Sequence, residues 1–416
     1  MAEPAEGMSA APSVYRQRDF VVFQLGRFLL TVAMQVQSVA IGWQIYEMEH
    51  TPLALGLVGL CQFAPMFLLT LPAGELADRF DQRHVLGAAL LMASLCSLLF
   101  MGLSLARVAS TTAFYAVLIL FGAGRGFSSP SAQSLLAFLV PPEKLARSIA
   151  LGSSVFMTAV IVGPALGGFL YAFGPVATYS VCAACFLIAG ACTFTLGGRR
   201  RSGLVANEAT RLERVIEGVR FVRERPVVFG AISLDLFAVL LGGATALLPV
   251  FARDILDTGP MGLGLLRSAP ALGAASMALW LARRPLERCT GAKMFAAVIL
   301  FGLATIVFGL SRNFFLSLAA LGVLGASDMV SVFVRQSLIN YATPDEMRGR
   351  VGAMSSLFVG ASNELGEFES GLTAAWFGTI PAVVIGGLGT LCVAALWMRL
   401  FPPLRAVDRL SDIRVA

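Results

Sequence analysis

Charged side chains stand at a few positions inside long apolar stretches of this sequence. An ion among apolar neighbours is costly, so such a side chain generally pairs with another charge, carries a proton or binds a ligand. These positions are Arg27, Arg125, Asp235, Arg267, Asp328, Arg335, Glu364, Glu367 and Glu369. Proton transfer and ion pairing are therefore the chemistry that the sequence predicts.

The spacing of these charges suggests which of them act together. Asp328 and Arg335 are seven residues apart and share one helix face, as do Glu364 and Glu367. Two carboxylates on one face do not both ionise at low cost in an apolar medium. We expect Glu364 or Glu367, together with Asp235 or Asp328, to carry a coupling proton. Alternatively, the charges form static ion pairs, and the glutamates only hydrate a cavity.

Polar and aromatic side chains near these charges predict a mixed surface for an amphipathic ligand. The candidates are Gln35, Gln37, Phe127, Asn363 and Trp376. Each of them has the alternative of facing a neighbouring helix.

Metal, cofactor and catalytic sites are not predicted. The sequence holds two histidines, no cluster at metal-ligand spacing and no nucleophile flanked by a base. A phosphate-binding loop is also missing, so ATP is not the expected energy source. We expect a gradient to drive the protein.

The elements that position these charges are membrane helices. The chain is 57% hydrophobic and 13% charged, against about 25% charged residues in soluble domains. Crossing ~30 Å of hydrocarbon takes ~20 helical residues. Twelve stretches qualify: 20–45, 54–73, 84–106, 113–140, 147–171, 177–197, 228–251, 261–282, 293–311, 314–341, 351–376 and 380–401. The expected fold class is all-α membrane protein, with twelve transmembrane helices.

Basic residues predict the orientation of these helices. Of the 31 lysines and arginines, 24 fall on the side of the termini, three on the other side and four inside the spans. The positive-inside rule then places both termini in the cytoplasm of a multi-pass inner-membrane protein. The net charge of +6 is explained by this bias, so we expect no nucleic-acid partner.

The longest polar interruption, residues 198–226, divides six spans from six. We expect an N-terminal six-helix bundle at 1–197, a cytoplasmic linker and a C-terminal six-helix bundle at 227–416. Val215, Val219 and Val222 recur at helical spacing in the linker, which predicts an amphipathic helix on the membrane surface. The alternative is a solvated linker helix.

The two bundles share a sequence repeat. A shift of 203 residues places Gly122 on Gly325, Gln133-Ser134-Leu135 on Gln336-Ser337-Leu338, Pro141 on Pro344, Arg147 on Arg350 and Gly168 on Gly371. Pseudo-symmetric halves with a ligand site between them are a common transporter plan. The same shift pairs Arg125 with Asp328, and we expect these opposite charges to meet across the cavity.

Two motifs resemble the major facilitator superfamily. Residues 74–83, GELADRFDQR, are similar to its cytoplasmic signature loop, although Asp81 replaces the turn glycine. The resemblance implies a cytoplasmic gate formed by Gly74, Asp78, Arg79 and Arg83. A loop that is basic only for topology is the alternative.

Span 5 contains the second motif. Residues 163–168, GPALGG, are similar to the antiporter motif of the same superfamily, which is associated with export. Its packing residues are Gly163, Pro164, Gly167 and Gly168. Glycines four residues apart allow close helix contact, and Pro164 favours a bend.

The strings AIGWQIY at 40–46 and TPDEMRGR at 343–350 resemble the branch that holds the enterobactin exporter and macrolide-efflux proteins, the transmembrane secretion effectors. The resemblance implies a proton-coupled exporter of small amphipathic molecules, drug-like or siderophore-like, that acts as a monomer by alternating access in contact with membrane lipid. Coupled uptake of a metabolite, or a non-transporting membrane sensor or assembly protein, are the alternatives.

Overall fold

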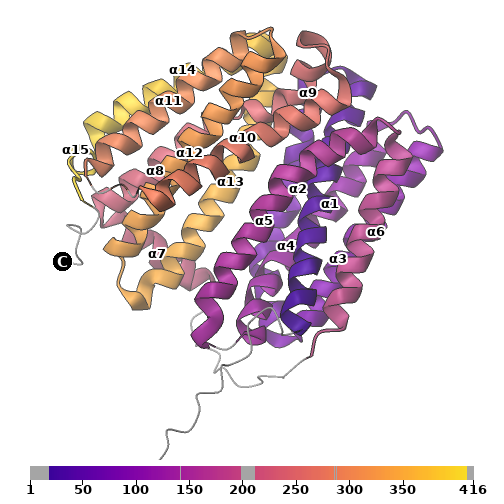
Figure 1. The fold of residues 1–416 in the computed structure, drawn as a ribbon, viewed down its shortest axis with the longest axis horizontal. Helices are drawn as coiled ribbons and strands as arrows, with labels where there is room; N and C mark the ends of the chain where they lie inside the picture. Colours follow the sequence, from indigo (N-terminus) through magenta and orange to yellow (C-terminus); the bar gives the residue numbers. More distant parts are fainter. Residues whose placement is uncertain (1–17, 141, 198–210, 285, 287, 410–416) are drawn as a thin grey trace, which may run out of the picture.

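The computed structural model describes residues 18–140, 142–197, 211–284, 286 and 288–409. The regular structure of these residues is entirely helical (Figure 1). The first six long helices are α1 (Arg18–Glu49), α2 (Pro52–Arg79), α3 (Gln82–Leu105), α4 (Thr111–Leu139), α5 (Pro142–Tyr171) and α6 (Pro175–Phe194). We refer to them as the N-terminal half.

The seventh span is interrupted. It consists of α8 (Pro226–Leu241), η2 (Ala244–Leu247), α9 (Leu248–Val250) and the π-helical turn η3 (Phe251–Ile255). The helix breaks at Gly242 and Gly243, and Gly243 lies against the carbonyl of Gly366, where a Cβ would not fit. The glycine thus permits a close backbone approach.

Five further long helices complete the C-terminal half, which runs from α8 to α14. They are α10 (Gly259–Arg283), α11 (Thr290–Leu310), α12 (Phe314–Ala342), α13 (Asp345–Phe377) and α14 (Thr379–Leu400), followed by the short α15 (Pro402–Arg405).

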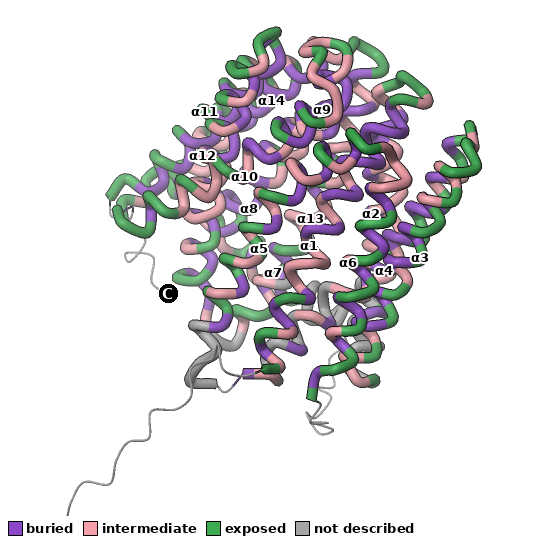
Figure 2. Tube along the Cα trace, turned by 45° about the vertical axis from the view of Figure 1, so that its right-hand side comes forward, coloured by how far each residue is buried: buried purple, intermediate pink, exposed green. Residues whose placement is uncertain are grey.

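The length and apolarity of these helices confirm the expected membrane fold. Ten helical segments of the described chain are long and apolar enough to span a bilayer, and α4 and α13, with 29 and 33 residues, complete the twelve. Large apolar side chains such as Leu68 (72% exposed) and Phe315 (75% exposed) face outward. Exposed residues recur along whole helices (Figure 2), which is the surface that acyl chains require.

The two halves are joined unevenly. We call the membrane side where α1 begins the terminal face, and the side where α1 ends the opposite face. One apolar cluster combines Tyr46 of α1 with Phe251 and Phe308 of the C-terminal half. Toward the terminal face each half has its own cluster, with Phe20 and Val140 in the N-terminal half and a separate set in the C-terminal half. The halves are therefore packed together at the opposite face.

The linker contributes α7 (Arg211–Arg223), while residues 198–210 lie outside the described part. Val222 is 2% exposed and packs with residues of α8, α12 and α13. Glu217 pairs with Arg350 of α13, whereas Ile216 is 56% exposed. One side of the expected amphipathic helix is thus held by the C-terminal half.

Candidate functional site

An ion pair joins the two halves. Nη2 of Arg125 on α4 lies 3.4 Å from Oε1 of Glu364 on α13, and its Nη1 donates to Oε1 of Gln62 on α2 at 3.2 Å. The side chains of Arg125 and Glu364 are 24% and 18% exposed. The pair is therefore neither sealed in a core nor free in solvent.

Two further charged residues, Glu367 of α13 and Arg267 of α10, belong to the same group of interacting charges. Glu364, Arg267 of α10 and Arg125 all act electrostatically on Glu367. Glu367 packs against α2, since a Cβ on Gly59 would lie 3.1 Å from its Oε2. Two arginines and two glutamates thus form a balanced group, which we call the inter-half charge cluster.

A different ion pair lies inside the C-terminal half. Nη2 of Arg335 on α12 is 3.2 Å from Oδ2 of Asp235 on α8, and its Nη1 donates to Ser355 of α13 at 3.2 Å. The Arg335 and Asp235 side chains are only 4% and 5% exposed. Ser331 donates to Asp235 at 3.5 Å.

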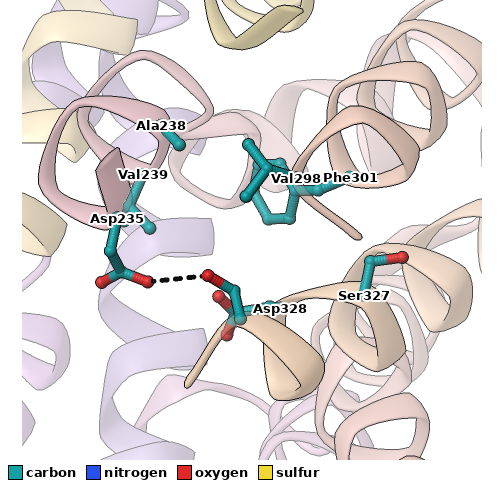
Figure 3. A pocket seen from close by; sticks show the side chains of 8 residues that line it. Asp235, Ala238, Val239, Val298, Phe301, Ser327 and Asp328 are labelled. Atoms are coloured by element: carbon teal, nitrogen blue, oxygen red, sulfur yellow. Dashed lines mark hydrogen bonds between the residues drawn. The ribbon is translucent and has the colours of Figure 1, made fainter. Parts of the chain in front are cut away.

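A small cavity lies beside this buried pair. Asp235 and Asp328 reach it from α8 and α12 (Figure 3), and Ser327, Ser331, Val298 and Phe301 also line it. Its volume of about 10 Å³ is close to the minimum that a water molecule needs.

The expected pairing of Arg125 with Asp328 is wrong. Arg125 pairs with Glu364 instead, and Asp328 faces Asp235 and Arg335 within its own half. The repeat identifies equivalent positions in two similar bundles, and equivalent positions need not face each other. The expectation that Asp328 and Arg335 share a helix face does hold, since Arg335 pairs with Asp235 and Asp328 lines the same cavity as Asp235.

The antiporter-like motif packs in two directions. Gly163 and Gly167 lie against Gln35, Val36 and Val39 of α1, inside the N-terminal half. The Pro164 carbonyl and Gly168 instead approach Gly264 and Pro260 of α10, in the other half. The motif therefore lies at the α5–α10 contact between the halves.

The repeat partner of Gly168 makes the equivalent contact. Gly371 of α13 packs on Gly56 of α2, where a Cβ on Gly371 would come 2.7 Å from the Gly56 Cα. The α5–α10 and α2–α13 contacts thus each bring one glycine against another near the opposite face.

A polar contact at the opposite face was not expected from the sequence. The hydroxyl of Tyr46 on α1 donates to Asp254 in the π-helical turn η3, and Tyr171 donates to Glu47 at 3.5 Å. A π-turn has no simple sequence pattern. In the sequence, only the charged residues Arg253 and Asp254 beside an apolar stretch could have indicated this contact.

The signature loop is partly helical. The backbone of Gly74, Asp78 and Arg79 belongs to α2, and their side chains lie outside the described part. Asp81 caps α3 by accepting from the Arg83 backbone N–H at 3.0 Å. Arg83 donates to Asp81 at 2.6 Å and to the Leu196 carbonyl at 2.6 Å.

These contacts stay within the N-terminal half, rather than bridging to the other half. The hydrogen bond from the Arg83 side chain holds the pKa of the Asp81 carboxyl below its usual value, although partial burial opposes this. The aspartate that replaces the turn glycine thus gains a capping role.

The residues expected to line a ligand surface are scattered. Gln37 is 1% exposed and accepts from Ser97 at 2.5 Å inside the N-terminal half. Gln35 packs against Gly163 on the α1–α5 contact. Phe127 is half-buried on α4, close in sequence to Arg125. These three do not form one surface.

The other two candidates lie on α13. Asn363 is exposed beside Glu364, and Trp376 is 70% exposed near the end of the helix at the opposite face. Asn363 is thus next in sequence to the inter-half charge cluster, whereas Trp376 is about two and a half helical turns beyond Glu367, the member of the cluster that is nearest to it in sequence.

Sequence comparison relates this chain to known exporters. Residues 9–414 match a family model described as transmembrane secretion effector. The enterobactin exporter EntS of Citrobacter koseri is 26% identical over 385 residues, which cover 92% of this chain and 91% of the exporter. The EntS of Shigella boydii gives the same identity and coverage.

Solved transporter structures share the fold. A bacterial homologue of the human lysosomal transporter Spinster, inward-facing and occupied, has a TM-score of 0.73 at 14% identity and covers 95% of this chain and 100% of that one. An inward-facing bacterial homologue of the iron transporter ferroportin has a TM-score of 0.69 at 18% identity, with coverage of 95% and 100%. At these identities the likeness concerns the fold alone.

Proposed function

Because the chain belongs to the transmembrane secretion effector family of the major facilitator superfamily and is a membrane transporter of that type, we propose that it exports small amphipathic organic molecules in exchange for protons. The similar proteins named enterobactin exporters and the antiporter-like motif support the direction. The ion pair between Arg125 and Glu364 carries the proposal of coupling.

The coupling follows from the position of this pair. Alternating access separates the halves on one side and then on the other. If Arg125 and Glu364 part, Glu364 becomes an uncompensated carboxylate at membrane depth, which is costly unless a proton neutralises it. Proton binding to Glu364 therefore favours separation of α4 from α13, and Glu367 is the adjacent second acceptor.

Substrate binding acts on the same contact. A substrate that donates hydrogen bonds to Glu364, or that accepts from Arg125, takes the place of one partner in the pair. A protonated Glu364 no longer offers the carboxylate, so proton and substrate bind in alternation. This is the exchange that an antiporter requires.

The orientation of the protein in the membrane is part of the same proposal. The basic residues favour a cytoplasmic terminal face in the inner membrane, so the conformation with its halves joined at the opposite face is open toward the cytoplasm. We propose that one copy of the chain, embedded in lipid, performs the cycle.

Everted vesicles test the function. Vesicles from cells that express the protein should accumulate a fluorescent amphipathic dye after acidification of the lumen, and dye addition should release lumenal protons. The Glu364→Gln and Glu367→Gln variants should lose the proton release. Glu369→Gln is the matched control, since this glutamate of α13 accepts from Thr373 in its own helix.

Different results in these assays would contradict different parts of the proposal. Dye accumulation with an unchanged proton signal in both variants would end the coupling proposal and retain export. Accumulation in right-side-out vesicles only would indicate uptake. If a reporter fused to the C-terminus were active outside the cytoplasm, the proposed cytoplasmic orientation of the terminal face would be wrong.

A further inference from the structure

The cavity between Asp235 and Asp328 has an unbalanced charge. Asp235 faces Arg335 at 3.2 Å, but Asp328 has no hydrogen-bond or ion-pair partner among the described residues. The charged groups that act on Asp328 are Asp235 from α8 and Arg335 from its own helix. The third lining helix, α11, contributes the apolar Val298 and Phe301. Two carboxylates therefore share one guanidinium.

An uncompensated carboxylate in a membrane-embedded bundle is unfavourable. One positive charge beside Asp328 restores neutrality, whereas a divalent ion would leave an excess positive charge. The carboxylates of Asp235 and Asp328 and the hydroxyl of Ser331 supply oxygen atoms at the cavity, and hard cations prefer oxygen ligands. The volume of about 10 Å³ suits an occupant of the size of one water molecule.

We propose that this cavity binds one monovalent cation, a proton or sodium, between Asp235 and Asp328. All of its lining residues belong to α8, α11 and α12, so the site stays intact when the halves move relative to each other. It is separate from the inter-half charge cluster and does not depend on the proposed export.

Thermal unfolding of the purified full-length protein in detergent tests the site without substrate or gradient. Sodium chloride replaces choline chloride at constant ionic strength and fixed pH, and a pH series follows in choline chloride. If sodium binds, the melting temperature rises by about 2–4 °C with sodium, because a ligand of the folded state stabilises it. If a proton binds, the melting temperature falls between about pH 6 and about pH 8, since the folded state then binds more protons than the unfolded state.

Asp328→Asn should abolish whichever response the wild type shows and should melt higher than the wild type in choline chloride at about pH 8. Asp328→Ser serves the same purpose if the asparagine variant does not fold. Glu369→Gln, which removes a carboxylate away from the cavity, should respond as the wild type does. A wild type and an Asp328 variant with the same dependence on sodium and on pH would overturn the proposal. The assay involves no transport, so its failure leaves the export proposal unaffected.

Discussion

Two ion pairs of similar length have different positions in this protein. Arg125 and Glu364 lie 3.4 Å apart and connect α4 to α13, across the two halves, with exposures of 24% and 18%. Arg335 and Asp235 lie 3.2 Å apart within the C-terminal half and are 4% and 5% exposed. In the proposed transport cycle the first pair must tolerate relative motion of its helices, whereas the second lies among helices of one half, which move together.

Burial gives the two pairs different energetic roles. Removing one partner of a fully buried pair leaves a charge without compensation, and this typically costs more than loss of an exposed pair. The pair between the halves has partial access to solvent or to a bound molecule, so its separation costs less. The proposed transport cycle opens the contact between the halves repeatedly and therefore requires this smaller cost, whereas a contact that holds one half together does not require it.

The largest predicted effect is on the buried pair. Arg335→Gln should lower the free energy of unfolding by about 3–5 kcal/mol, because Asp235 and Asp328 would remain without a guanidinium. Thermal unfolding in detergent measures the loss. The double variant Asp235→Asn/Arg335→Gln is the control and should recover most of the stability. If the single and the double variant were equally unstable, packing and not charge would explain the effect.

The pair between the halves should respond in transport rather than in stability. Arg125→Gln is expected to reduce the initial rate of dye accumulation in everted vesicles by about tenfold, equivalent to about 1.4 kcal/mol, with a melting temperature close to that of the wild type. The double variant Arg125→Gln/Glu364→Gln should show a coupling energy of about 0.5–3 kcal/mol relative to the single variants. Additive effects would mean that the two residues act separately.

The sequence predicted the helices well because hydrocarbon imposes a long, uniform apolar length. The expected stretch 314–341 is observed as Phe314–Ala342, and 380–401 as Thr379–Leu400. The largest differences at helix ends are six residues: α2, expected to end at 73, reaches Arg79, and α13, expected to begin at 351, begins at Asp345. The signature loop is polar, but no residue before Phe80 breaks the helix.

The partners of the charges were less predictable. Spacing shows which residues share a face, but it does not fix how a helix is rotated within a bundle. Glu364 and Glu367 were identified as a pair by their spacing, whereas the partner of Arg125 was assigned wrongly. The contact between Tyr46 and Asp254 was missed because it depends on a π-turn and on two distant segments.

Two glycines of α5 differ in the same way, since Gly163 packs within its own half and Gly168 packs against the other half. Gly168→Ala would place a Cβ against the Pro260 carbonyl and Gly264 of the other half, whereas Gly163→Ala would meet Gln35 of the same half. Overpacking of this kind costs about 1–3 kcal/mol. We expect Gly168→Ala to increase hydrogen exchange in η3 by separating the halves at the opposite face, and Gly163→Ala to leave this exchange unchanged.

Gly360→Ala is the matched control, because no atom outside its own helix lies within 4 Å of the added Cβ. Equal exchange in η3 for Gly168→Ala and Gly360→Ala would show that the α5–α10 contact does not hold the opposite face closed.

The smallest predicted effect concerns the contact of Asp81 with Arg83, a charged contact inside the N-terminal half at the terminal face. Asp81→Ala removes the cap of α3 and should lower the free energy of unfolding by about 1 kcal/mol. The lowered pKa of Asp81 gives the sign of the pH dependence. The stabilisation is present above the unfolded-state pKa of 3.8 and is lost as the pH falls through the lower folded-state value.

Asp81→Asn separates the two components of this contact, since an asparagine keeps the capping hydrogen bond and removes the charge. Urea unfolding should rank the wild type above Asp81→Asn and Asp81→Ala lowest, and the gap between the wild type and Asp81→Asn should shrink in acid. A gap that stays constant down to about pH 3 would show that the carboxylate charge contributes nothing. Dye accumulation should change little in both variants, because Arg83 and Asp81 make their observed contacts inside one half and these contacts need not break as the halves move.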